Sequence, residues 1–189
     1  MVEKQAERIK DLMQSMRASF EAGLSQAALR ASKIQLMNAI PGHWFSAAAS
    51  ECMQMYVGGN FYGAISVAQS YVEALGKFLA ENQKIRQSSD VTVMWKRLEN
   101  KSIVTLDSRA AAEEIFSDRN DFHHLNKNLE TDYLKLESRG LVCINNLHII
   151  ESDVFAYVIS EGKIYPSWPK YWPESNDAPG HISVFLRNL

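Results

Sequence analysis

The sequence predicts an all-α protein that folds as one helical bundle with an irregular tail. Apolar residues recur at spacings of three and four along most of the first 160 positions, which is the period of an amphipathic helix. Asparagine, aspartate and glycine stand between these stretches, where helices begin and end. Near residue 165 the pattern stops, and prolines alternate with aromatic residues. We therefore expect a helical domain over residues 1–165 and a C-terminal arm over residues 166–189 that packs on it.

The first helix is predicted over residues 3–39. Its apolar face comprises Ile9, Met13, Met16, Phe20, Leu24 and Ala27, with charged and polar residues between them. Gly23 lies inside this stretch and lowers its helix propensity by about 1 kcal/mol. The Pro41-Gly42 pair then breaks the chain, and a second helix is expected from His43 through Tyr56.

Three further helices are predicted in the middle of the chain. Asn60 is the expected N-cap of the most regular one, whose apolar positions are Phe61, Ile65, Ala68, Val72, Leu75 and Leu79. This regularity predicts a helix at the centre of the core. Asp90 is expected to cap a short helix, and Asp107 to cap another that runs through Phe116.

Ser117 or Asp118 is predicted to cap a new helix. Its apolar face would comprise Phe122, Leu125, Leu129, Tyr133 and Leu136. Arg119 would lie in the first turn, where unpaired N–H groups and the helix dipole favour an anion. At about 100° per residue, His124 would point away from the core. Two interpretations are open for His124: a solvated polar face, or one wall of a site completed by a second copy of the chain.

The last part of the chain is less regular. Apolar residues from Leu141 to Val158 keep near-helical spacing and favour one long helix, although their β-branched members leave a strand pair as the alternative. Residues 164–173 alternate prolines with Tyr and Trp and cannot form a regular helix. We expect an extended arm whose rings pack on the edge of the core, with a proline-rich ligand as the alternative.

Composition narrows the class of protein. A net charge of -2 argues against coating nucleic acid through bulk positive charge, so any RNA contact has to be local. No run approaches the roughly 18 apolar residues of a membrane span, and the N-terminus is too charged for a signal peptide. We expect a cytoplasmic protein with no membrane partner.

Cys52 and Cys143 lie far apart, and the histidines lack metal-ligand spacing, so we expect free or buried thiols, no metal and no cofactor.

The stretch richest in side chains that could take part in catalysis runs from Phe116 to Lys127. Within it, Arg119, Asn120 and His124 read R-N-x-x-x-H. At these residues the chain resembles the HEPN superfamily, whose ribonucleases carry an arginine, a polar neighbour and a histidine at this kind of spacing. The stretch from Gly59 to Leu79 also looks like the HEPN helix that packs against the motif helix.

The resemblance implies a HEPN-like helical bundle that acts as a metal-independent endoribonuclease in a toxin or phage-defence role. Arg119 and His124 would be the catalytic residues, and Asn120, His123 and Lys127 would bind the RNA substrate. The active groove would form between two subunits of a homodimer, and an antitoxin or other regulatory protein would restrain it. The first alternative is an inactive HEPN-like module that binds a protein partner or a nucleotide, and the second is an unrelated helical scaffold.

The residue types suit this reaction. RNA cleavage without a metal needs a base for the ribose 2′-hydroxyl, an acid for the leaving 5′-oxygen and a cation near the phosphorus. Imidazole titrates near neutral pH, and the guanidinium fork of arginine matches two phosphate oxygens. On an ideal helix Arg119 and His124 lie roughly 140° apart around the helix axis. The two can therefore bind the same ligand only if the long arginine side chain reaches around the helix or a partner chain contributes one of the groups.

Overall fold

The computed structural model describes residues 2–35, 37–124, 127, 129–176, 178 and 180–187. This part of the chain is mostly helical and adds two small antiparallel sheets. The helices are α1 (Val2–Ala31), α2 (Ser46–Val57), α3 (Phe61–Asn82), α4 (Val91–Asn100), α5 (Leu106–Phe116), α6 (Arg119–His124) and α7 (Tyr133–Val154). The strands are β1 (Ala39–Pro41), β2 (Tyr157–Ser160), β3 (Lys163–Pro166) and β4 (Val184–Leu186), and a 3-10 turn, η1, covers Pro169–Tyr171.

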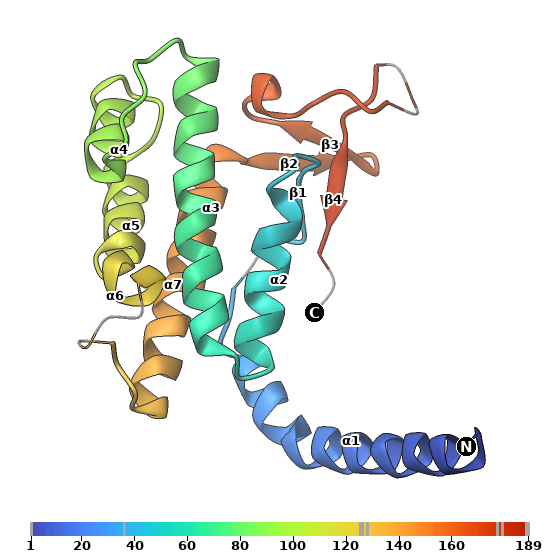
Figure 1. The fold of residues 1–189 in the computed structure, drawn as a ribbon. Coiled ribbons are helices and arrows are strands. Elements are labelled where there is room, and N and C mark those ends of the chain that lie inside the picture. The colour runs from blue at the N-terminus through green and yellow to red at the C-terminus, as the bar shows by residue number, and fades with distance from the viewer. Residues whose placement is uncertain are drawn as a thin grey trace.

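Helix α3 is the centre of the bundle, as its regular spacing predicted. It stands between α2 on one side and α4 and α5 on the other, and it also packs against α7 (Figure 1). Its predicted apolar positions are all buried, from Phe61 to Leu79. Gly76 lets α4 approach closely, because a Cβ there would stand 2.5 Å from the Met94 Cε atom. The core is therefore built around one helix whose sequence already marks it as central.

The predicted caps are confirmed at α3 and α4 and wrong at α5. The Asn60 side chain accepts the N–H of Gly63, and the Asp90 side chain accepts the N–H of Val93. At α5 the cap is Thr105, whose hydroxyl accepts the N–H of Ser108, and Asp107 lies in the first turn instead. Thr105 has the extended backbone that an N-cap requires.

The first helix ends earlier than the predicted residue 39. Arg30 holds the end of α1 on the body, because its guanidinium donates to the Val57 carbonyl and pairs with Glu137 at 3.6 Å. After the helix, β1 pairs with β4, and Ile40 lies opposite Phe185. The rest of α1 extends away from the bundle (Figure 1), and its apolar face is exposed.

The predicted last helix through Val158 is wrong at its end. Helix α7 stops at Val154, and residues 157–166 form the hairpin of β2 and β3. The strand pair left open from Leu141 to Val158 is therefore wrong up to Val154, and strand begins only at Tyr157. Its turn consists of Glu161 and Gly162, with φ of 50° and 74°. Positive φ at both central residues is the geometry of the tight hairpin turns that match strand twist. The expected boundary between residues 165 and 166 falls within β3.

Two aromatic residues of the C-terminal segment lie in the core. Tyr171 and Trp172 are buried, whereas Trp168 stays about half exposed. Further along, Arg187 forms a buried ion pair with Glu151 of α7, with nitrogen to oxygen distances of 2.6 and 2.5 Å. Burial alone would lower the pKa of Arg187, but the Glu151 carboxylate outweighs it and raises that pKa. The pair ties the tail of the described chain to the bundle.

Candidate functional site

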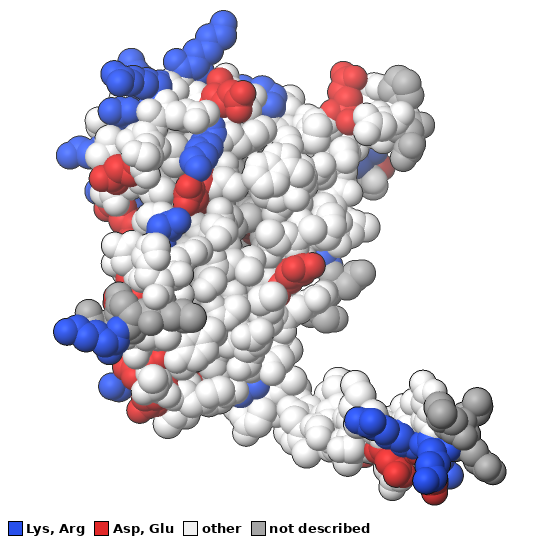
Figure 2. All heavy atoms as spheres, viewed as in Figure 1, with Lys and Arg blue, Asp and Glu red and all other residues white. Residues whose placement is uncertain are grey.

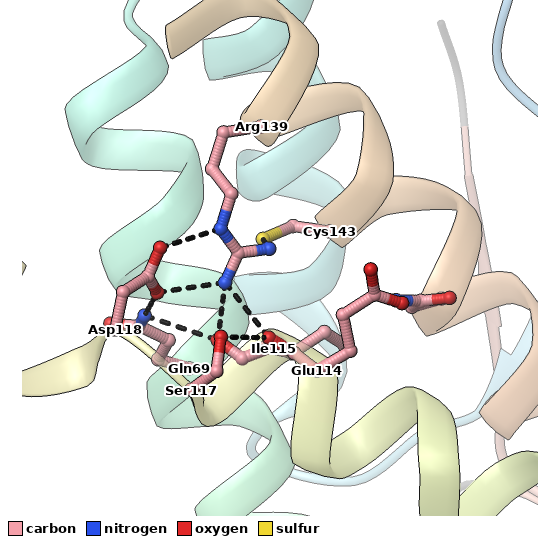
Figure 3. A network of polar contacts seen from close by, with 8 residues as sticks. Gln69, Glu114, Ile115, Ser117, Asp118, Arg139 and Cys143 are labelled. Carbon is pink, nitrogen blue, oxygen red and sulfur yellow. Dashed lines mark hydrogen bonds and ion pairs between the residues drawn. The ribbon is translucent and has the colours of Figure 1, made fainter. Parts of the chain in front are cut away.

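The junction between α5 and α6 positions the predicted site. Asp118 was expected to cap α6, but its carboxylate binds the Arg139 guanidinium of α7 instead, with distances of 2.6 and 2.7 Å (Figure 3). The Gln69 amide of α3 donates to the same carboxylate at 2.9 Å. Ser117, the other expected cap, is the C-cap residue of α5. The start of α6 is therefore fixed by contacts with two long helices.

Arg139 links this junction to the end of α5. Its Nη2 donates to the carbonyls of Glu114 and Ile115 as well as to Asp118 (Figure 3). These carbonyls belong to the last turn of α5, where helix carbonyls lack intrahelical donors. Burial would lower the pKa of Arg139, but the hydrogen bond and charge of Asp118 raise it. The guanidinium stays charged and holds the junction in place.

The predicted single helix from residue 119 through residue 136 is wrong. Helix α6 has six residues, and α7 begins anew at Tyr133 with Asp132 as its N-cap. The Asp132 carboxylate accepts the N–H groups of Leu134 and Lys135. Phe122 and Leu136 are both buried, so parts of the predicted apolar face do enter the core from two separate helices. Leu125 lies outside the described residues.

Arg119 lies against α3. Its Nη2 atom is 3.6 Å from a Glu73 carboxylate oxygen, and its guanidinium lies over the Phe116 ring, 5.3 Å from the centroid. The Arg119 side chain is one-third exposed. A separation of 3.6 Å is long for a charge-assisted hydrogen bond, and Lys77 holds Glu73 more tightly, at 2.6 Å. The guanidinium is therefore held in place, and some of its N–H donors remain available to another acceptor.

His123 shares this environment. The pKa of His123 is lowered by partial burial first and by the Arg119 charge second, and Glu73 opposes the change. Arg119 and His123 are four residues apart, which places them on one face of α6. The neighbouring His124 is exposed and also acts to lower the pKa of His123. The structure therefore brings together Arg119, His123 and Glu73, with His124 beside them.

The other predicted RNA contacts lie at the surface. Asn120 and Lys127 are both exposed. Glu73, which lies directly after the buried Val72 on α3, was not predicted from the sequence, and neither was the ion pair of Asp118 with Arg139. The only signal for Glu73 was its place on the flank of a central apolar stripe, and that place also fits a solvated residue.

An open pocket of about 670 Å³ lies at the other end of α3, away from α6. Among the described residues, its lining includes four basic residues and no acidic one: Gln83, Lys84, Ile85, Arg86, Arg97, Asn100, Lys101 and Ile103. Figure 2 shows basic side chains gathered over this end of the bundle. Because α3 and α4 both end here, the cations also offset the negative ends of two helix dipoles. They still surround a hollow that an anion can enter.

Metal and thiol chemistry find little support in the described residues. Among them, no group of three or more His, Cys, Asp or Glu side chains could hold a metal ion. Cys52 and Cys143 are free and buried, and burial raises the pKa of both thiols, that of Cys143 to about 12. In the same part of the chain, no helix has the length and apolar character needed to cross a membrane.

No protein-family model, curated protein or solved structure matches the chain. Fold and site together define a mostly helical protein that presents a guanidinium, two imidazoles and a carboxylate near the junction of α3, α5 and α6.

Proposed function

We propose that the protein is a metal-independent endoribonuclease of HEPN type with a toxin or phage-defence role in the cytoplasm. The observation that carries the proposal is the grouping of Arg119 with two histidines on one short helix, with both imidazoles exposed. Among the described residues, Arg119 contacts Glu73 through a long ion pair and also lies over the Phe116 ring, and neither histidine is a core residue. Exposed ion pairs of this kind add little stability, so stability alone does not require these residues.

The roles follow from charge and protonation. Arg119 would stabilise the negative charge that develops on the phosphate, because its guanidinium remains protonated and forms two parallel hydrogen bonds to an anion. His124 would transfer protons between the ribose and the leaving oxygen. His123, whose lowered pKa favours the neutral ring at pH 7, would accept a proton or bind RNA. Asn120 and Lys127 would contact the backbone of the substrate.

A second copy of the chain would complete the groove. One α6 supplies one guanidinium and one exposed pair of imidazoles, whereas cleavage needs a base and an acid on opposite sides of the same phosphate. In a homodimer the two motifs would supply both. A regulatory protein such as an antitoxin would silence the enzyme by covering this face.

The basic pocket at the far end of α3 would hold another part of the RNA. Its four cations can neutralise phosphates without reading the bases. The net charge of the whole chain is only -2, so this local concentration of positive charge is enough to make one end of the bundle attractive to a polyanion. Substrate would then be held at the pocket and cut at α6.

The second candidate function is an inactive HEPN-like module that binds a protein partner or a nucleotide. One observation favours it, because Glu73 already partners the Arg119 guanidinium. A substrate phosphate has to compete with this carboxylate, whereas a partner protein could use the pair as it stands. The two candidates therefore differ in whether Arg119 exchanges Glu73 for phosphate.

Cleavage of a fluorescently labelled RNA in the presence of EDTA tests the proposal. The Arg119→Ala and His124→Ala variants should each lose cleavage while keeping the helical circular dichroism of the wild type. Arg8→Ala and His181→Ala remove the same residue types from exposed positions elsewhere and should cleave normally. Equal cleavage by all proteins would indicate a contaminating nuclease and reject the enzyme, and an inactive wild type that binds its partner would favour the module.

A further inference from the structure

Within the part of the chain that the structure describes, no other segment covers the apolar face of helix α1. It is 30 residues long, about 45 Å at the rise of an α-helix, and it leaves the body below α2 and α3 (Figure 1). Its large apolar side chains are each between 50% and 70% exposed: Ile9, Leu12, Met13, Met16, Phe20 and Leu24. In Figure 2 the same helix appears as a projecting arm. A stripe of this length exposed to water requires a covering surface.

The spacing of the stripe is that of a helix that pairs with another helix. Ile9, Met13, Met16 and Phe20 follow at steps of four, three and four, and Gly23 and Ala27 continue the alternation. Alternating steps of four and three make a seven-residue repeat, the repeat that keeps one seam facing a partner helix in a left-handed coiled coil. Six large apolar side chains that are at least half exposed form a continuous surface along the helix, and a standard interface takes roughly 800 Å² from each partner.

The charges of α1 favour a helix over a lipid surface. Residues 3–21 carry four basic and four acidic residues: Lys4, Arg8, Lys10 and Arg17 against Glu3, Glu7, Asp11 and Glu21. Helices that lie on membranes are rich in Lys and Arg on their polar face, because the lipid surface is anionic. A balanced polar face offers no such attraction. It does allow a second helix with the same balance to approach without net repulsion.

The junction of α1 with the body indicates how the second helix lies. Phe20, Leu24 and Ala27 line a groove whose other wall is formed by Val57 and Tyr133. The end of the stripe thus faces its own bundle. In a parallel pair the two-fold axis would run along the helices, and the helical bundle of the partner would then enter this groove. In an antiparallel pair the segment around Ile9 of the partner would lie there instead.

We propose that α1 pairs with α1 of a second copy as an antiparallel coiled coil. The seam then sets Phe20 opposite Ile9 of the partner subunit, and Met13 opposite Met16 of the partner subunit. The pairing covers the stripe and fills the groove at each end. This inference stands on the apolar face of α1 and does not depend on the ribonuclease activity proposed for α6.

The test is the oligomeric state of the full chain, measured by sedimentation equilibrium. The wild type should be a dimer at micromolar concentration. The double variant Met13→Glu with Met16→Glu places carboxylates in the seam and should raise the dissociation constant at least about 100-fold. Its body should remain folded, because both methionines are exposed in the single chain. The matched control, Gln14→Glu with Ala18→Glu, adds the same charge outside the seam and should stay dimeric.

A monomeric wild type at 100 μM, a concentration about 100-fold above ordinary micromolar affinity, would overturn the proposal, as would a dimer that survives both seam charges. Flotation with vesicles of phosphatidylcholine and phosphatidylglycerol is the second readout. Binding by the wild type that the seam variant loses would assign the face to lipid and overturn the pairing.

Cysteine cross-linking tests the orientation. Chains with Ile9→Cys and chains with Phe20→Cys should form a mixed disulfide when combined, because these positions meet in the antiparallel seam. Each variant alone should stay largely reduced. The native Cys52 and Cys143 are buried and do not interfere. Efficient disulfide formation by Ile9→Cys alone would show a parallel pair and overturn the orientation.

Discussion

The carboxylate of Asp118 and the guanidinium of Arg139 form a two-pronged ion pair, 2.6 and 2.7 Å long, across 21 residues of sequence. The pair joins the residue before α6 to the second turn of α7. Because Arg119 directly follows Asp118, the same contact sets where the candidate site begins. The position of the motif therefore depends on a residue outside it.

Replacing Arg139 should destabilise the fold and move the motif. Arg139→Met leaves the partly buried Asp118 carboxylate and two carbonyls at the end of α5 without their donor, which should cost about 3 kcal/mol. Urea unfolding measures the loss. The double variant Arg139→Met with Asp118→Asn should regain part of it, since the unpaired charge is gone. A cost below about 0.5 kcal/mol would mean that the pair behaves as an exposed surface ion pair.

Removing the carboxylate beside Arg119 should strengthen RNA binding. In Glu73→Gln the guanidinium loses its 3.6 Å partner and becomes free to bind a phosphate. We expect the affinity for a non-cleavable RNA, measured by fluorescence anisotropy, to rise about 3-fold to 10-fold, the gain expected from one relieved charge contact. Glu81→Gln changes an exposed carboxylate farther along the same helix and serves as the control. Unchanged affinity in Glu73→Gln would argue that RNA does not contact Arg119.

The sequence predicts well where local signals decide the structure. Helix α3 follows from its apolar spacing and its Asn60 cap, and α4 follows from Asp90. The break between α6 and α7 was missed, because the apolar period runs through it and the Asp132 cap lies inside that period. A strand was left only as the alternative to a helix near Val158, because β-branched residues at near-helical spacing fit either state.

Only part of the candidate site could be predicted from the sequence, and the reason differs from that for the helix boundaries. Arg119, His123 and His124 are close together in sequence, so the sequence alone indicates that they lie near one another. Glu73 reaches Arg119 only once α3 and α6 pack, and Asp118 reaches Arg139 only across α5 and α7. Contacts between charged residues far apart in sequence leave no periodic signal. Only the folded arrangement shows that the motif arginine already has a partner.

Neutralising the basic pocket should weaken RNA binding and its salt dependence. Lys84→Gln with Arg86→Gln removes two of the four cations that line the pocket. The slope of log affinity against log salt concentration should become shallower by about 1.5, the value for two lost phosphate contacts on single-stranded RNA. Lys10→Gln with Lys163→Gln removes the same charge from exposed sites elsewhere and should leave the slope unchanged. Equal slopes in both variants would place the RNA away from the pocket.

Acid should loosen the attachment of the aromatic arm through His43. Burial lowers the pKa of His43, and the hydrogen bond from its Nε2 to the Tyr171 carbonyl, 2.8 Å long, opposes this only in part. The unfolded chain therefore binds more protons than the folded chain around the usual histidine pKa of about 6.5, so stability is full above that pH and falls as the pH drops below it. Urea unfolding between pH 7.5 and pH 5, the range of about one to two units around that value, should show this decline. His43→Gln keeps a donor for the carbonyl but cannot titrate, so its decline should be shallower. Parallel curves for the two proteins would assign the acid sensitivity to other groups, of which His123 is the first to replace, because its pKa is lowered in the same direction.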